Sequence, residues 1–466
     1  MTDRSLNRRK FLQLAGLSTA ALSIGITVPK LVGRTANGLV VESEEEYGGF
    51  LVEKMNAGKL PYRYDPQVLK AMNEKMTMFS RNVWDPARQK RPELTEDLFH
   101  ENLIKGKGKV PNQTRLDYAF MAASWTVAGN RDYPSYKWDV QSGMIRMLQR
   151  EVPQAWDPKD LDMSWEEASL AVKHAALFYG ASLCGMAVLN PLWLYSHRYS
   201  PTRENKEQTI PILSESERLE QADDAWYIPK SMNRVIVLAF EEDYNAIANS
   251  PGRLASAATG NGYSRMAVTA FTLAEFIRGL GYRAIPAGNG VGLSIPMALD
   301  AGLGELGRNG LLVTPKYGPR VRLAKVITDM PLTVDAPISF GVTEFCKNCM
   351  VCAEQCPSGA IPKGDLTWKG KSPSNNHGVY KWYVEQEKCY DFNGFSCSSC
   401  KMTCPFNKPN NSWLHRLIRQ VIRKRIGVAD KIMVTLDKAG GYGRQVPASR
   451  FWKKSGRASI TAREQA

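Results

Sequence analysis

Apolar residues recur with helical or strand spacing through the middle of the chain, between residues 164 and 328. Residues 165–179 have an apolar face at helical spacing and follow Ser164, with Glu166 and Glu167 in the first turn. Serine caps free backbone N–H groups, and acidic side chains favour a helix N-terminus. Residues 165–179 are therefore predicted to form an amphipathic helix.

Strands and further helices are predicted after this segment. Short apolar runs indicate strands at 183–189, 235–240, 284–286 and 321–328. One helix is predicted to begin at Gly262 and to end at the glycines 279 and 281, and another covers 293–301. Helices packed around a mixed sheet define an α+β architecture, which is the fold class we expect.

Residues 37–160 are predicted to form an irregular, mostly helical N-terminal region. Segments 66–79 and 117–125 have helical spacing, whereas 81–85 and 132–134 are expected to be loops.

Residues 1–36 have the features of a targeting signal. Arg8 and Arg9 precede a weakly apolar stretch that reaches Val28 and is interrupted by small and polar residues. This pattern is typical of a twin-arginine export signal, a route used by proteins that fold around cofactors before export. A membrane anchor is the alternative, but the stretch is short and weakly apolar for a spanning helix.

Eight cysteines near the C-terminal end form the strongest chemical motif. Cys346, Cys349, Cys352 and Cys356 are followed by a proline, which gives the C-x2-C-x2-C-x3-C-P pattern of bacterial ferredoxins. A second group, also followed by a proline, consists of Cys389, Cys397, Cys400 and Cys404. Eight thiolates suit two [4Fe–4S] clusters, which relay single electrons.

In two-cluster ferredoxins the fourth cysteine of each run binds the other cluster. We therefore expect one cluster on Cys346, Cys349, Cys352 and Cys404, and the other on Cys356, Cys389, Cys397 and Cys400. Structural zinc sites are the alternative, since C-x2-C pairs also bind zinc. Three cysteines at two-residue intervals, followed by a fourth before proline, favour iron–sulfur clusters. The ninth cysteine, Cys184, lies in an apolar stretch and is assigned no function.

The net charge of +15 is concentrated at the two ends of the chain. Residues 1–36 hold six basic and one acidic residue (+5) and residues 411–466 hold thirteen and three (+10), so 37–410 sums to zero. This distribution does not favour a nucleic-acid partner. Residues 413–426 are predicted to form a basic amphipathic helix, which either lies on a membrane or a membrane partner, or packs on the cluster domain.

Three features together carry a family resemblance. They are the twin-arginine signal, the two cysteine runs, and a core with Gly-Tyr-Ser-Arg at 262–265 and a glycine-rich run at 302–310. The glycine-rich run spells G-x-G-x-x-G but follows a predicted helix, so it is not interpreted as a dinucleotide site. Over essentially its whole length the chain resembles the corrinoid-dependent reductive dehalogenases of organohalide-respiring bacteria.

The resemblance implies a domain order and an activity. Residues 161–335 would form a nitroreductase-like core that binds a cobamide, residues 336–410 a ferredoxin-like module with two [4Fe–4S] clusters, and 411–466 a basic segment. The enzyme would replace a carbon–halogen bond of a small organohalide by carbon–hydrogen, with two electrons and one proton, as the terminal reductase of organohalide respiration.

The resemblance also implies a location and partners. The protein would be periplasmic, on the outer face of the cytoplasmic membrane. A small hydrophobic membrane-anchor subunit would attach it peripherally, a membrane electron donor would reduce it, and it would form homodimers.

In the family, a tyrosine, an asparagine and a basic residue lie over the cobalt. The matching residues are Tyr263, Asn289 and Arg322, with Arg320 as the alternative basic residue, and Thr259 is expected in the pocket wall. The tyrosine would supply the proton, the arginine would stabilise the phenolate, and the asparagine would orient substrate or halide beside the cofactor. The sequence has no Asp-x-His-x-x-G and its five histidines are isolated, which agrees with a base-off cobamide.

Two other functions fit parts of the sequence. Epoxyqueuosine reductase is a related cobamide enzyme that acts on tRNA in the cytosol, and both the export signal and the neutral central part argue against it. The second is a non-catalytic two-cluster electron-transfer subunit, which does not need the long α+β region before Cys346.

Overall fold

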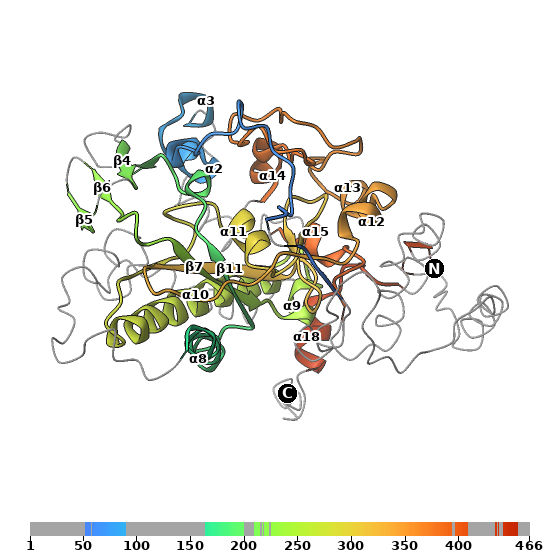
Figure 1. Cartoon of the computed structure of the whole chain (residues 1–466). Helices are drawn as coiled ribbons and strands as arrows, with labels where there is room; N and C mark the ends of the chain where they lie inside the picture. Colours follow the sequence, from blue (N-terminus) through green and yellow to red (C-terminus); the bar gives the residue numbers. More distant parts are fainter. Residues whose placement is uncertain are drawn as a thin grey trace, which may run out of the picture. The chain divides into compact units, whose positions relative to one another are not determined.

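The computed structural model describes residues 52–89, 164–199, 209–393, 397–408 and 434–454, apart from residue 57 and a few positions within 215–224 and 436–440. Its centre is a four-stranded sheet in the order β2-β7-β11-β8, with all neighbours antiparallel (Figure 1). The strands are β2 (Leu183–Val188), β7 (Arg234–Glu241), β8 (Ala284–Ala287) and β11 (Val321–Thr328). All four were predicted to within one residue at each end, because apolar and β-branched residues dominate these segments.

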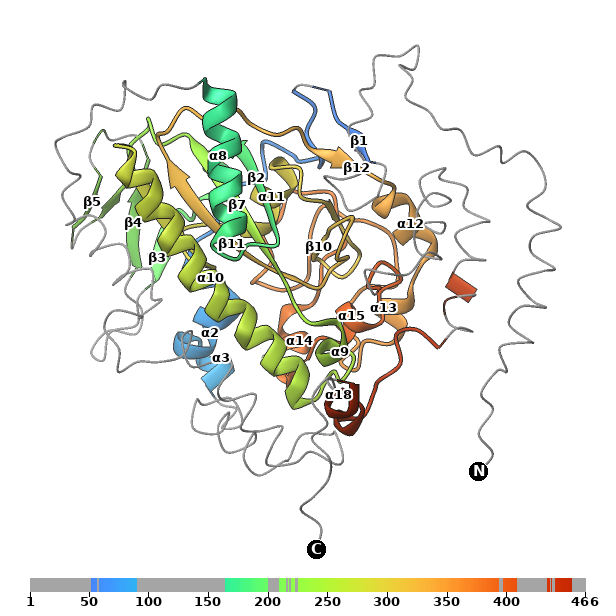
Figure 2. The same cartoon turned by 90° about the horizontal axis from the view of Figure 1, so that it is seen from below.

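Helices α8 (Trp165–Phe178) and α10 (Arg253–Gly279) cover one face of this sheet, as Figures 1 and 2 show. Helix α8 begins with the predicted cap, in which Ser164 Oγ accepts from the Glu167 N–H and the Glu167 carboxylate accepts from the Ser164 N–H. A core of buried side chains, including Ile236 and Leu273, lies between these helices and the sheet. Burial of this apolar face is the main force that holds the helices to the sheet.

The predicted start of α10 at Gly262 is wrong, since the helix begins at Arg253. Glycine inside a helix costs about 1 kcal/mol, which is why Gly262 indicated a helix start. Packing decides otherwise, because a Cβ on Gly262 would lie only 2.6 Å from Cγ of Arg322 on strand β11. The glycine lets helix and strand approach closely. As a result Tyr263 lies in the interior of α10 and not in its first turn.

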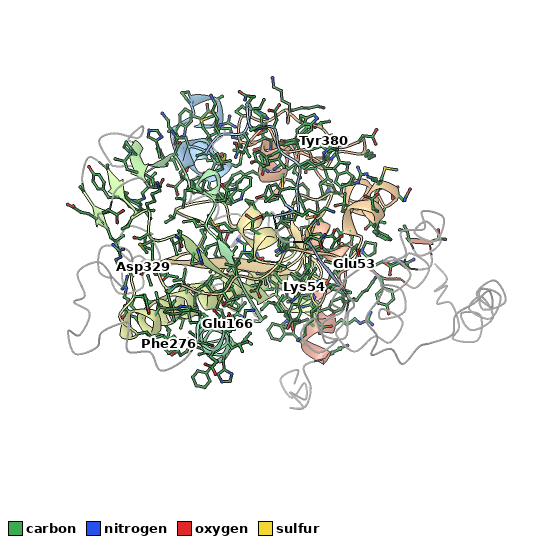
Figure 3. The ribbon with its side chains drawn as sticks, viewed as in Figure 1. Glu53, Lys54, Glu166, Phe276, Asp329 and Tyr380 are labelled. Carbon is green, nitrogen blue, oxygen red and sulfur yellow. The ribbon has the colours of Figure 1, made fainter. Side chains whose placement is uncertain are left out.

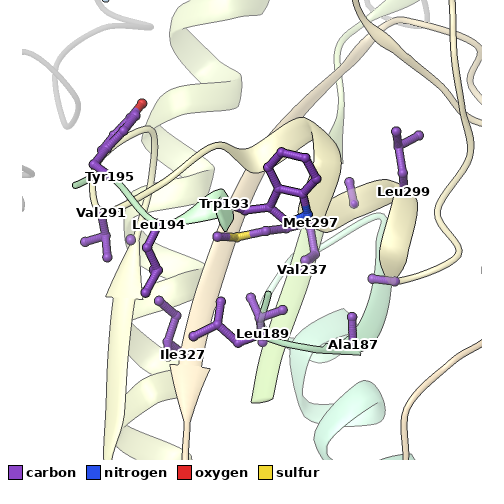
Figure 4. Close-up of a cluster of buried hydrophobic side chains, with 14 of the residues drawn as sticks. Ala187, Leu189, Trp193, Leu194, Tyr195, Val237, Val291, Met297, Leu299 and Ile327 are labelled. Carbon is purple, nitrogen blue, oxygen red and sulfur yellow. The ribbon is translucent and has the colours of Figure 1, made fainter. Parts of the chain in front are cut away.

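The opposite face of the sheet is covered by α11 (Ser294–Asp300) and a short 3-10 helix, η4 (Pro191–Trp193). Trp193 and Met297 pack there against Val237 and Ile327 of the sheet (Figure 4). Figure 3 shows the two sides, with Glu166 and Phe276 on the side of α8 and α10 and Tyr380 on the other. The described residues thus form the predicted α+β arrangement, a sheet with a helical layer on each face.

Smaller sheets lie around this centre. A second four-stranded sheet has the order β3-β4-β6-β5, with β4 and β6 parallel. Its strands are β3 (His197–Tyr199), β4 (Thr209–Leu213), β5 (Glu220–Gln221) and β6 (Trp226–Tyr227). Two antiparallel pairs complete the described strands: β1 (Glu53–Lys54) with β12 (Ile338–Ser339), and β9 (Glu305–Leu306) with β10 (Leu312–Val313).

The N-terminal segment differs from its prediction. Instead of one helix over 66–79 and a loop at 81–85, it forms the 3-10 helix η1 (Glu74–Met76), α2 (Met78–Trp84) and α3 (Pro86–Gln89). Two local caps explain the shift, because the Asn73 side chain accepts from the Lys75 N–H and Thr77 Oγ1 accepts from the Ser80 N–H. The predicted helix is therefore wrong for residues 66–73, and most of the predicted loop at 81–85 is helical.

The cysteine-rich part is built from short helices: α12 (Val342–Asn348), α13 (Val351–Glu354), α14 (Gln386–Asn393) and α15 (Ser399–Met402). The short helix α9 (Tyr244–Ile247) and helix α18 (Ala448–Lys454) pack beside it. The predicted signal at 1–36, the segments 117–125 and 132–134, and the basic helix at 413–426 lie outside the described residues. In the part of the chain that is described, no helix combines the length and apolar composition needed to cross a bilayer.

Candidate functional site

Three predicted site residues come together from three separate elements. Tyr263 lies on helix α10, Asn289 follows strand β8, and Arg322 lies near the start of strand β11. The Asn289 side chain donates its Nδ2 hydrogen bond to the Tyr263 hydroxyl at 2.8 Å. The Arg322 guanidinium lies over the Tyr263 ring, 4.0 Å from its centroid. A phenol is thus held between an amide and a cation, with the amide side exposed.

Arg320, the alternative basic residue, lies in a different environment. Its side chain is fully buried and forms an ion pair with Glu241, and it also donates to the Glu242 carbonyl at 2.8 Å. Arg322 lies over the Tyr263 ring, whereas Arg320 lies over the rings of Tyr244 and Tyr317. Of the two arginines, the geometry favours Arg322 beside Tyr263.

A cavity of about 550 Å³ borders this group, with Asn289 in its wall. Three glycines also line it, Gly290, Gly292 and Gly310, so that backbone instead of side chains forms part of the surface. A cavity with bare backbone beside a tyrosine, an amide and an arginine fits a bulky group bound next to the phenol. Thr259 does not line the cavity, since it is buried and donates to Glu242 Oε1 at 3.0 Å.

The first cysteine group surrounds a small enclosed space. Cys346, Cys349, Cys352 and Cys404 all line it, together with Arg308 and Phe406. Burial, and after it the neighbouring Cys346, raises the pKa of Cys349 to about 12. Burial also raises the pKa of Cys352 and of Cys404, with neighbouring thiols adding to the effect. Four ionised thiols around one space repel one another unless cations bind between them, and the irons of a [4Fe–4S] cluster would supply that charge.

The second group is formed by the other four predicted ligands. Burial, followed by Cys397 and Cys356, raises the pKa of Cys389 to about 11. Burial, followed by Cys397 and Cys389, raises the pKa of Cys400. Cys400 in turn contributes, after burial, to the raised pKa of Cys352 in the first group. The two groups are therefore neighbours, as an electron relay requires. Among the described residues, no three His, Cys, Asp or Glu side chains are close enough together to hold one metal ion.

Comparison with known proteins agrees with this arrangement. Residues 345–407 match the family model of the 4Fe-4S double cluster binding domain. The chain is 37% identical over 374 residues to the tetrachloroethene reductive dehalogenase of Sulfurospirillum multivorans, covering 76% of this chain and 73% of that protein. It is 41% identical over 408 residues to one from Desulfitobacterium hafniense, with the same coverage. The chain belongs to the reductive dehalogenases. The predicted family and its double-cluster domain are thereby confirmed.

A solved reductive dehalogenase structure shares the fold with a TM-score of 0.59 and 20% identity, covering 84% of this chain and 49% of the other. The epoxyqueuosine reductase of Listeria monocytogenes is a weaker relative, 25% identical over 172 residues, or 34% of this chain. Reductive dehalogenases were preferred over epoxyqueuosine reductases from the sequence, and the larger coverage agrees with that preference.

In this reductive dehalogenase chain, the glycine-rich run contacts the cluster segment. Arg308 is buried, donates to the Cys346 carbonyl at 2.8 and 3.0 Å, and lies over the Trp382 ring at 4.5 Å. It also donates to the carbonyls of Pro362 and Gly364 at 2.9 and 2.8 Å. Sequence reasoning found the motif but not this role, because the partners of Arg308 are backbone carbonyls distant in sequence.

A buried ion pair between Glu242 and Lys401 was also missed. Glu242 follows strand β7 and accepts from Thr259, while Lys401 follows the predicted ligand Cys400. The pair therefore connects the cluster segment to helix α10, which carries Tyr263. Charged residues of opposite sign occur throughout the chain, so no sequence signal could have identified this pair.

Proposed function

We propose that this protein is a reductive dehalogenase that replaces the carbon–halogen bond of a small organohalide by carbon–hydrogen. The step consumes two electrons and one proton and releases halide. The electrons would reach a base-off corrinoid in a nitroreductase-like core through two [4Fe–4S] clusters. The observation that carries this proposal is the contact of Tyr263 with both Asn289 and Arg322 at the edge of the cavity.

The three side chains suit the proton part of the reaction. Tyr263 would donate its hydroxyl proton to the carbon that loses halogen, and the hydrogen bond from Asn289 to that hydroxyl supports this role. Arg322 lies over the ring and stabilises the phenolate left behind. General-acid help of this kind is typically worth about 10²–10⁴-fold in rate. A corrinoid bound in the cavity would supply strongly reducing electrons beside this acid.

The cysteine groups would hold the two clusters as the ferredoxin pattern implies. One space is lined by Cys346, Cys349, Cys352 and Cys404. This supports a scheme in which the fourth cysteine of each run binds the cluster of the other run. After burial, the charges of Cys397 and Cys356 raise the pKa of both Cys389 and Cys400. The four remaining cysteines are therefore close together, which supports the second ligand set. Because the groups are adjacent, single electrons can pass between the clusters.

The proposed location rests on the sequence alone. We propose export by the twin-arginine route and peripheral attachment to the outer face of the cytoplasmic membrane, through a small hydrophobic subunit. A membrane electron donor would supply the clusters, and the enzyme would act as a homodimer. Support comes from Arg8 and Arg9 in the signal and from the basic segment after residue 411.

The test uses protein purified without oxygen from a corrinoid-producing host. Expected are about eight irons per chain, an extractable cobamide with its visible absorption, and halide release from tetrachloroethene with a reduced viologen. A panel of chlorinated ethenes, alkanes and phenols then defines the substrate class. Protein with a full iron content that takes up no cobamide and releases no halide would disprove the proposal.

A further inference from the structure

Lys325 lies inside the central sheet, on the opposite face of strand β11 from Arg322. Its neighbours across the strands are Val237 and Ala287, and its side chain is fully buried. Neighbouring positions on a strand face opposite sides, and β11 positions 324 and 326 belong to the core beneath α10. A buried amine is costly unless its hydrogen bonds are satisfied, so the partners of Lys325 show what it does.

Those partners are the two ends of the loop that carries Asn289. Lys325 Nζ donates to the Gly288 carbonyl at 2.6 Å and to Ser294 Oγ at 3.0 Å. Ser294 Oγ in turn donates to the Gly288 carbonyl at 3.4 Å. The lysine therefore joins the end of strand β8 to the first residue of helix α11, on either side of Asn289.

The loop needs this support because its backbone is strained. Val291 has φ of +69°, in the left-handed region that β-branched residues rarely adopt. Such a conformation is unfavourable and persists only where surrounding contacts fix it.

A second set of contacts holds the loop from the other side. The Tyr195 N–H donates to the Val291 carbonyl at 2.9 Å, and its hydroxyl donates to the Asn289 carbonyl at 3.3 Å. Figure 4 shows Tyr195 beside Val291, and Trp193 and Leu194 directly before Tyr195 in the chain. The loop is thus clamped between this segment and Lys325.

We infer that Lys325 is a positioning residue that holds the loop from Gly288 to Ser294 so that Asn289 reaches the Tyr263 hydroxyl. The inference rests on the proposed function of Asn289. Lys325 acts through the loop alone, since it faces away from Arg322.

The test compares Lys325→Met with Thr328→Val in the holoenzyme. Thr328 is a matched control, since it is buried on the same strand and donates to the Arg283 carbonyl at 2.7 Å, outside the loop. In Lys325→Met, amide hydrogens of residues 288–293 should exchange at least about tenfold faster, because both hydrogen bonds from Lys325 to the loop are lost. The kcat should fall about 100-fold with little change in KM, because a small displacement of a catalytic group is costly. Thr328→Val should leave both unchanged.

Unchanged loop exchange and kcat in Lys325→Met would overturn the inference, as would equal effects of both substitutions. If Lys325→Met does not fold, Ser294→Ala removes one of the two contacts. Faster loop exchange in that variant supports the inference, and unchanged exchange overturns it. If wild-type protein releases no halide while Lys325→Met still loosens the loop, the proposed function fails and the role of Lys325 in the loop stands.

Discussion

The guanidinium of Arg322 lies 4.0 Å from the centre of the Tyr263 ring, although one residue is on a strand and the other on a helix far from it in sequence. A cation over an aromatic face is attracted by the ring, by about 0.5–2 kcal/mol depending on exposure. The contact exists because Gly262 allows helix α10 to lie close to the strand.

Replacing Tyr263 by Phe removes the proposed proton donor and keeps the ring beneath Arg322. We expect turnover to fall by about 10²–10⁴-fold, with cobalt and iron content unchanged. Halide release and metal analysis on the same preparation measure both quantities. Unchanged turnover would exclude Tyr263 from the mechanism.

Replacing Gly262 by Ala tests the close approach of helix and strand. The added Cβ would lie 2.6 Å from Arg322 Cγ, so Arg322 must shift and turnover should fall by about 10- to 100-fold. Gly279→Ala, on the same helix, is the control, because its Cβ would meet nothing within 4 Å. That variant should keep its activity and gain about 0.4–1 kcal/mol of stability, because alanine restricts the unfolded chain more than glycine does. Equal activity in the two variants would contradict the prediction.

The two arginines near the start of strand β11 should respond differently to substitution by Gln. Arg322→Gln should lower turnover and change the Tm little. Arg320→Gln breaks the ion pair with Glu241 and should destabilise the fold by about 3 kcal/mol. Thermal unfolding and steady-state kinetics separate the two effects. An Arg320→Gln enzyme that keeps its Tm but loses turnover would transfer the catalytic role to Arg320.

Cys352→Ala should remove one cluster. We expect about four irons per chain instead of about eight, with the second cluster still visible by electron paramagnetic resonance. Cys184→Ala is the matched control, because that cysteine lies on strand β2 away from both groups and should leave iron content unchanged. A full iron content in Cys352→Ala would refute the ligand scheme.

Lys325 should make stability depend on pH. Burial lowers the pKa of Lys325 to about 7, from 10.5 for an exposed lysine. Between these values the unfolded chain binds a proton that the folded chain does not, so the free energy of unfolding rises with pH in this window. One proton contributes at most about 1.4 kcal/mol per pH unit. Between pH 7 and 9, the free energy of unfolding should rise less steeply with pH in Lys325→Met than in wild type. Equal slopes in the two proteins would contradict the lowered pKa of Lys325.

Local patterns in the sequence predicted the four central strands and helix α8 well. Capping and periodicity act within a few residues, so Ser164 and Glu167 define the start of α8 without help from the rest of the chain. The predicted start of α10 was wrong because it depends on a contact between residues that are distant in sequence. Gly262 indicates a helix start by its propensity, and only its contact with Arg322 explains a glycine inside the helix.

The sequence by itself determined the family and the double-cluster domain, because ligand spacing such as that of Cys346, Cys349 and Cys352 is a local property. The ferredoxin pattern also predicted that Cys404 joins the first three cysteines, and all four line one space. Only the tertiary structure decided which arginine lies over Tyr263 and that Lys325 ties the ends of the loop around Asn289. These contacts join strands, helices and loops that are distant along the chain. They depend on how the elements pack, which residue spacing does not encode.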